Sequence, residues 1–158
     1  MFIQSTLIKL INPECLPVRG SEHAAAFDCF PNIQQDFTML PGEERIVGLG
    51  FALALPAAMC ALLIPRSGMG AKTGVVISNL VGLIDQDFRG EVTAALWYRR
   101  DPDNENNKPV LIARKTRIVQ ILFIPSFIPQ LEQVCDFTDK TARGESGFGH
   151  TGGNAVAA

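Results

Sequence analysis

The sequence has little of what marks several large classes of protein. It contains two histidines, and its four cysteines form no Cys-x-x-Cys pair, so no structural zinc site is expected. A formal net charge of −2 gives no basic excess for a nucleic-acid partner. Residues 1–6 lack a basic start followed by an apolar run, so no signal peptide is predicted. Helix signals are scarce, and there is no internal repeat.

One uncharged stretch, residues 46–65, is long enough to raise the question of a membrane span, which needs about 20 apolar residues. Gly48, Gly50 and Pro56 interrupt it, and Pro56 divides it into two short apolar runs. We therefore expect two buried strands here and no membrane partner.

The bulk composition is that of a single globular domain. Hydrophobic residues make up 47% of a chain of 158 residues, which is enough for one sizeable core. The cysteines are scattered among apolar neighbours, and such cysteines are more often buried free thiols of a reducing compartment than disulfides. We therefore expect a cytoplasmic protein. The four are Cys15, Cys29, Cys60 and Cys135.

Glycine and proline recur at short intervals, and the runs between them are rich in Val, Ile, Leu and Phe. This punctuation predicts many short β-strands, and hence an all-β barrel or sandwich. The expected strands are residues 6–10, 46–55, 59–64, 75–77, 91–98 and 117–124. One helical turn is predicted at residues 67–72, capped by Ser67. The Gly-rich segment 141–158 is predicted to be a flexible tail on a domain of residues 1–140.

The segment from Pro65 to Gly70, Pro-Arg-Ser-Gly-Met-Gly, is a candidate anion site. Free N–H groups at the start of a helical turn bind anions, and glycines let a phosphate approach the backbone. Arg66 adds a fixed positive charge. An ordinary connection from a strand to a turn, with Ser67 as a cap, explains the same residues equally well.

A second candidate site lies in residues 79–91, where Asp85 follows Gly-Leu-Ile and precedes Gln-Asp-Phe-Arg-Gly. A carboxylate at a turn between two apolar strands can orient a water as a general base. Phe88 can lie against a ring or a sugar. Taken alone, the pattern favours a plain hairpin tip, where Asp and Gly are common for conformational reasons.

Three further features are weaker when read singly. Gln120 is the lone polar side chain of an apolar strand, and its amide needs partners, so a structural role is favoured. Arg143 and Phe148 can close over a ligand from the Gly-rich tail, although the composition alone favours a disordered tail. Asp28 is one carboxylate in an apolar run; it can hold Mg²⁺ through a water, or it can face solvent at a strand end.

In their order and spacing, these segments resemble the five motifs of the trimeric, all-β dUTPase family. The corresponding residues are 25–29, 65–68, 79–91, 117–120 and 143–152. The resemblance covers nearly the whole chain. It implies a single-domain β-barrel, similar to a jelly roll, with one short helix and a flexible C-terminal tail that closes over the active site.

The resemblance also implies an activity. The family hydrolyses dUTP to dUMP and pyrophosphate by attack of water on the α-phosphorus, with Mg²⁺ as cofactor. This reaction keeps uracil out of DNA and supplies dUMP for dTMP synthesis. The chain is thus expected to be a dUTP diphosphatase that forms a homotrimer with shared active sites. Two alternatives are a nucleotide-binding module without turnover and a dCTP deaminase, which shares the fold.

By similarity, Asp85 orients the attacking water, while Gln120 and Arg143 complete the catalytic set. Asp28 steadies Mg²⁺ through a water. The implied substrate-binding residues are Arg66, Ser67, Gly68, Asn79, Gly82, Leu83, Ile84, Asp85, Phe88, Thr93, Gln120, Arg143, Phe148, Gly149, His150 and Thr151. The chain departs from the family pattern at Ala26, Phe88, Val119 and Ser146, and none of these changes removes a group that the chemistry needs.

Overall fold

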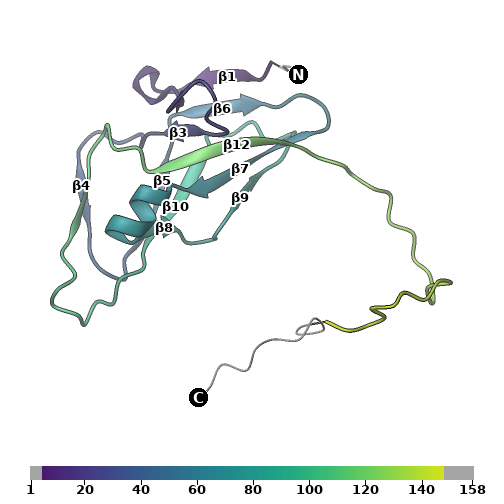
Figure 1. Ribbon diagram of the computed structural model, residues 1–158. Coiled ribbons are helices and arrows are strands. Elements are labelled where there is room, and N and C mark those ends of the chain that lie inside the picture. The colour runs from purple at the N-terminus through teal and green to yellow at the C-terminus, as the bar shows by residue number, and fades with distance from the viewer. Residues whose placement is uncertain (1–4, 148–158) are drawn as a thin grey trace. The chain divides into compact units, whose positions relative to one another are not determined.

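The computed structural model describes residues 5–147 (Figure 1). The chain divides into two compact units, Met1–Ile128 and Pro129–Ala158, and every described strand lies in the first. Strands dominate, with two short helical turns, which confirms the predicted all-β class. The predicted boundary at residue 140 stays a prediction. Within residues 5–147, neither helical turn has the length or apolar character to cross a bilayer.

The strands are short, as the spacing of glycine and proline predicts. They are β1 (Leu7–Leu10), β2 (Val18–Arg19), β3 (Phe27–Cys29), β4 (Phe37–Met39), β5 (Glu44–Gly48), β6 (Phe51–Ala54), β7 (Met59–Pro65), β8 (Val75–Ile77), β9 (Gly82–Ile84), β10 (Thr93–Tyr98), β11 (Val110–Ile112) and β12 (Val119–Pro125). The helical turns are η1 (Pro13–Cys15) and η2 (Met69–Thr73).

Two local predictions are wrong. The single strand expected at residues 46–55 is two strands, because Gly50 has a φ of +71° and breaks the chain between β5 and β6. Ser67 does not cap the helical turn: the cap position of η2 is Gly68, without a side-chain hydrogen bond. The turn itself lies close to its predicted place.

A five-stranded sheet in the order β2-β3-β12-β7-β9 carries the candidate site. All of its pairs are antiparallel. The register sets Gln120 opposite both Asp28 and Ile64, and it sets Gly82 opposite Leu63. Residues that face each other in this way share one side of the sheet. Asp28 and Gln120 are therefore neighbours on one side, and Gly82 points to the other.

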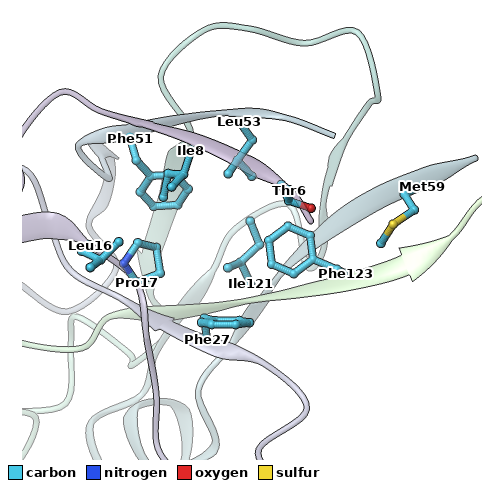
Figure 2. A pocket seen from close by; sticks show the side chains of 10 residues that line it. All are labelled: Thr6, Ile8, Leu16, Pro17, Phe27, Phe51, Leu53, Met59, Ile121 and Phe123. Carbon is cyan, nitrogen blue, oxygen red and sulfur yellow. The ribbon is translucent and has the colours of Figure 1, made fainter. Parts of the chain in front are cut away.

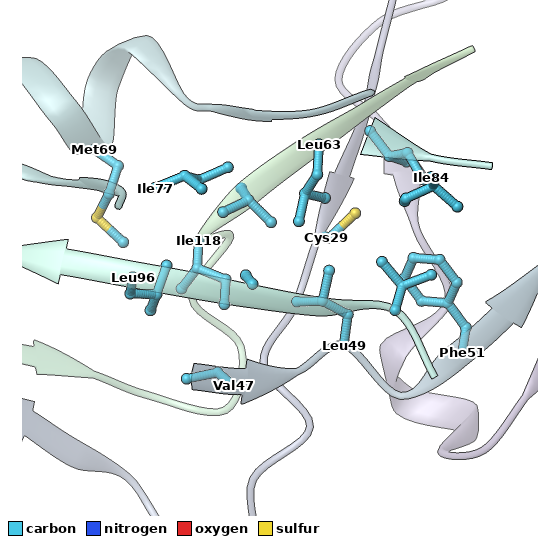
Figure 3. Close-up of a cluster of buried hydrophobic side chains, with 14 of the residues drawn as sticks. Cys29, Val47, Leu49, Phe51, Leu63, Met69, Ile77, Ile84, Leu96 and Ile118 are labelled. Atoms are coloured by element: carbon cyan, nitrogen blue, oxygen red, sulfur yellow. The ribbon is translucent and has the colours of Figure 1, made fainter. Parts of the chain in front are cut away.

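The inner side of this sheet forms part of the hydrophobic core, and Figure 3 shows side chains from several strands meeting there. Leu63 of β7 and Ile121 of β12 are almost completely buried, as is Cys29 of β3. Alternate residues such as Leu62 and Gln120 are only half-buried, because successive side chains of a strand point to opposite sides. The core thus fixes the backbone on which the polar residues stand.

Candidate active site

A hollow of about 250 Å³ lies beside β9 and brings together the central residues of the predicted site. Seven of the predicted substrate-binding residues line it: Asn79, Gly82, Leu83, Ile84, Asp85, Phe88 and Thr93. Leu63 and Val92 complete the wall. The residues come from β9, from the loop before it and from the turn after it, so the local chain path builds most of the hollow.

The turn after β9 places a carboxylate and an aromatic ring on the surface. Ile84 is buried and paired with Ala61 of β7, whereas Asp85 is exposed. The backbone N–H of Phe88 donates to the Asp85 carbonyl oxygen at 3.2 Å. The Phe88 residue is 43% exposed, and a Cβ on Gly90 would lie 2.8 Å from its ring. The ring therefore rests against Gly90, with surface free for a ligand.

The loop before β9 holds a strained residue next to Asn79. Leu80 has a φ of +64° and is 72% exposed. This conformation costs a branched residue roughly 1–3 kcal/mol, and such strain concentrates at functional sites. Two backbone bonds hold the bend, from Leu80 N to Ile77 O at 3.1 Å and from Val81 N to Asn79 O at 2.7 Å. The bend brings Asn79 to the wall of the hollow.

A second polar cluster is centred on Asp28, which is only 8% exposed. Arg66 Nε donates to Asp28 Oδ1 at 2.6 Å, and Arg66 Nη2 donates to Oδ2 at 3.3 Å. Arg117 Nη1 also donates to Oδ2, at 3.2 Å. The alternative of an aspartate facing solvent is therefore wrong. Because a two-pronged pair fixes the plane of a guanidinium, Asp28 orients Arg66.

The cluster has the charge of an anion site. Two guanidinium groups meet one carboxylate, so one positive charge is left over. The side chains of Arg66 and Arg117 are 30% and 46% exposed, so both can be reached from solvent. Ser67 and Gly68 are exposed next to them, and a Cβ on Gly68 would meet nothing within 4 Å. The protein's own packing thus leaves open space at Gly68, where a phosphate can approach the backbone.

Gln120 lies at the same place. Its Nε2 donates to the carbonyl oxygen of Pro65 at 3.0 Å, directly before Arg66. This bond is the structural role favoured from the sequence, and it also sets the amide beside the anion site. Arg117 was not predicted as a site residue, although it begins the motif that ends in Gln120. Its partner Asp28 is 89 positions away, so only the fold reveals the contact.

The Asp28 cluster also decides how a metal ion can be held. The carboxylate already accepts three hydrogen bonds of about four that it can accept. Within residues 5–147, no group of three His, Cys, Asp or Glu side chains could hold a metal ion. These residues therefore form no cage of protein ligands for Mg²⁺. One acceptor position remains on Asp28, and it fits a water that belongs to a hydrated Mg²⁺.

Arg143, from the second unit, lies in an exposed turn. Its Nε donates to Ser146 O at 2.9 Å, and its Nη2 donates to Gly147 O at 3.5 Å. The remaining predicted tail residues lie outside the described part of the chain: Phe148, Gly149, His150 and Thr151. The part that Arg143 and these residues play in the site stays a prediction.

Another cavity, of about 300 Å³, has a different character (Figure 2). Its lining is apolar except for Thr6, and the rings of Phe27 and Phe123 meet edge to face at 5.9 Å within it. None of the predicted site residues contributes to it. A cavity without a charged group does not suit a triphosphate.

An all-β fold with a small hollow and a cationic cluster defines a class of β-proteins suited to a phosphorylated ligand. The chain belongs to the dUTPase family, whose model matches residues 13–152. It is 34% identical to the deoxyuridine 5'-triphosphate nucleotidohydrolase of Psychrobacter cryohalolentis, over 95% of this chain and 99% of that protein. The protein of that name from Haemophilus influenzae is 39% identical, over 87% of each chain.

A solved structure shares the fold. The dUTPase of Staphylococcus bacteriophage 80alpha, in a structure with dUPNHPP, superposes with a TM-score of 0.82 at 26% identity. The match covers 95% of this chain and 99% of that one. The predicted family and fold are confirmed.

Proposed function

We propose that the chain hydrolyses dUTP to dUMP and pyrophosphate, the activity that the names of its relatives carry. One observation carries the proposal for the site: seven of the predicted substrate-binding residues line a single hollow. The relatives are named nucleotidohydrolases, so neither a dCTP deaminase nor a module without turnover is favoured.

In this mechanism Asp85 acts as the general base. It accepts a proton from water while the water oxygen forms a bond to the α-phosphorus. The bond between the α-phosphorus and the bridging oxygen breaks, and pyrophosphate leaves with the electron pair. Asp85 suits this role because it is exposed at the edge of the hollow, directly after the buried Ile84. The turn that follows β9 presents this base to the substrate.

In the proposed trimer with shared sites, the triphosphate would lie along the cationic cluster of a neighbouring copy, because Asp28 and Gln120 of one chain lie on the side of the sheet opposite to Gly82. Attack on a phosphate depends mainly on positioning and on neutralising charge. Arg66, Ser67 and Gly68 would hold the phosphate chain, with Arg66 already oriented by Asp28. Gln120 would contact a phosphate or the attacking water from the neighbouring strand.

The base and the sugar would be selected by the hollow. Asn79 and the backbone of Gly82–Ile84 would offer uracil donors and acceptors that cytosine cannot match. Phe88 would pack against the deoxyribose and leave no room for a 2′-hydroxyl. Thr93, at the start of β10, would complete the wall.

Mg²⁺ is the cofactor proposed for this reaction, held by Asp28 through one of its waters. Bound to the phosphates, it would supply positive charge against the charge that develops on the leaving pyrophosphate. The protein's part is to present the remaining acceptor position of Asp28 and to keep Arg66 in place.

We also propose a homotrimer in which the tail completes the site. Arg143 would meet the γ-phosphate and Phe148 would cover the uracil, together with Gly149, His150 and Thr151. Large apolar side chains around the junction of the two units, such as Phe127, Ile128 and Leu131, are exposed in the single chain and would be buried by a partner copy. Sedimentation as a fully active monomer would refute the trimer. The four free cysteines support a reducing, cytoplasmic location.

The first experiment is pyrophosphate release from dUTP, dCTP, dTTP and UTP, each with and without Mg²⁺. Release from dUTP alone, dependent on Mg²⁺, is the expected result. No release from dUTP by folded protein would refute the proposed activity and favour a module without turnover. Ammonia from dCTP would identify a deaminase.

A further inference from the structure

Glu91 ends the turn that carries Asp85 and Phe88, and the mechanism above gives it no role. Glu91 does not line the hollow, and its carboxylate accepts from donors that do not line it either. Oε1 accepts two hydrogen bonds, from Asn32 Nδ2 at 2.9 Å and from the backbone N–H of Gly50 at 2.8 Å. These donors are 59 and 41 positions away in the sequence.

The contact continues through the barrel as a chain of polar groups. Asn32 Oδ1 accepts from Asn12 Nδ2 at 3.1 Å, and the Asn32 backbone N–H donates to Gly48 O at 2.8 Å. Glu91 is thereby joined to the segment after β1 and to the turn between β5 and β6. Linked polar groups of this kind, with their donors satisfied, hold one arrangement of the backbone.

The end of β5 has room for this carboxylate because Gly48, the last residue of the strand, has no side chain. A Cβ on Gly48 would lie 2.5 Å from Glu91 Oε1, closer than any real contact. The observed position of the Glu91 carboxylate therefore requires a glycine at position 48.

The anchor lies next to the hollow. Val92, the residue after Glu91, lines the hollow. Its N–H donates to Phe51 O, and its carbonyl oxygen accepts from Leu49 N, both at 2.9 Å. At the other end of the turn, Ile84 is buried in the core. Residues 85–90 are all exposed, so core packing does not fix them. Hydrogen bonds inside the turn, from Phe88 N to Asp85 O and from Arg89 Nη1 to Gln86 O, shape it, and its two ends fix it to the rest of the fold.

We propose that Glu91 is a positioning residue for the hydrolysis: by binding Asn32 and Gly50, it fixes the returning end of the turn and so places Asp85 and Phe88 against the nucleotide. The inference rests on the proposed dUTPase activity. Loss of the anchor would let the turn shift, and a displacement of about 1 Å at a reacting group can cost about 100-fold in rate.

The test compares Glu91→Ala with Glu91→Gln. Alanine removes the acceptor of both donors, whereas glutamine keeps one oxygen in the same place. We expect kcat/KM for dUTP to fall about 10- to 100-fold in Glu91→Ala, and to stay within about 3-fold in Glu91→Gln. Glu44→Ala is the matched control, because Glu44 is an exposed glutamate on β5 away from the hollow, and it should match the native enzyme.

A purely structural role would lower the amount of folded protein without changing how the folded protein selects its substrate. The deciding measurement is therefore the ratio of kcat/KM for dUTP to that for UTP, taken at a temperature where each variant is folded. We expect the ratio to fall in Glu91→Ala, because Phe88 packs less closely on the sugar. An unchanged kcat, KM and ratio, with only a lower Tm, would overturn the proposal.

If Glu91→Ala does not fold, Asn32→Ala is the second variant, since it removes one donor and leaves the Gly50 bond. It should show a smaller fall in kcat/KM and in the dUTP/UTP ratio, and no change in either would refute the inference. A native enzyme that fails to hydrolyse dUTP would refute the proposed function. An active native enzyme with unaffected Glu91 and Asn32 variants would refute the positioning role alone.

Discussion

Removing the Asp28 carboxylate should destabilise the fold and disturb the anion site together. Breaking a buried ion pair by deleting one partner costs about 3–5 kcal/mol. Here the side chains of Arg66 and Arg117 are 30% and 46% exposed, and both can turn to water once Asp28 is gone. Solvent screening and hydration of the two guanidinium groups lower the free-energy cost of breaking the pair. We therefore expect Asp28→Ala to lose about 2 kcal/mol of unfolding free energy. Asp28→Asn, which keeps one acceptor oxygen, should lose about 1 kcal/mol.

Urea unfolding followed by tryptophan fluorescence would measure this loss. Trp97 is the only tryptophan, and it lies half-buried on β10. All variants need the same protein concentration, because assembly adds to apparent stability. Asp103→Ala is the control: Asp103 is an exposed aspartate in the polar loop 101–109, and its loss should change stability by less than about 0.5 kcal/mol.

The Asp28 variants also test whether the reaction needs a fixed orientation of the Arg66 guanidinium, and not only its charge. Without its carboxylate partner, Arg66 keeps its charge but loses its fixed plane, so kcat/KM for dUTP should fall by at least about 10-fold. An Asp28→Ala protein that keeps native stability and native kcat/KM would show that the ion pair neither supports the fold nor positions Arg66.

Three further outcomes are expected. Asp85→Asn should lower kcat about 10²- to 10⁴-fold while calorimetry still detects nucleotide binding; retained turnover would disprove the general base. Truncation after Thr141 should remove most of the activity, and an unchanged rate would disprove the closing role of the tail. Burial raises the pKa of the Cys29 thiol from 9.0 to about 12. Stability is therefore intact below pH 9 and falls as the pH rises toward 12, because only the unfolded thiol loses its proton; urea unfolding at about pH 8 and about pH 10 measures this.

The strands that the sequence predicts most clearly are the long ones, and of the three-residue strands it predicts only β8, at residues 75–77. β7 and β12 each have seven residues and are clear from their apolar runs. β2, β3 and β9 have only two or three residues each, too few for an alternating pattern to stand out. They exist because neighbouring strands offer them partners: β3 pairs with β12, β9 pairs with β7, and β2 pairs with β3. This pairing is a property of the tertiary structure.

For the candidate site, too, the sequence predicts the local features and misses the contacts between distant residues. Asp85 and Phe88 lie within one short motif, and their hollow is formed by residues close to them in the sequence. By itself, that motif favoured a plain hairpin tip, and the order of five motifs was needed to assign a function. The contacts of Arg117 with Asp28 and of Glu91 with Asn32 span 89 and 59 positions. No local pattern predicts such pairs.

The two carboxylates Asp28 and Glu91 explain how exposed site residues can be held in place. A residue that touches substrate has to be open to solvent, so the core cannot clamp it. In the first unit, Asp28 holds Arg66 from beneath, and Glu91 holds the end of the turn that carries Asp85. Hydrogen bonds depend on angle as well as distance, so they orient the groups that they hold, whereas apolar packing has no such directional preference. The exposed site residues are thus positioned by hydrogen bonds to less exposed residues, Asp28 and Glu91. The side chains of these supporting residues need not contact the nucleotide.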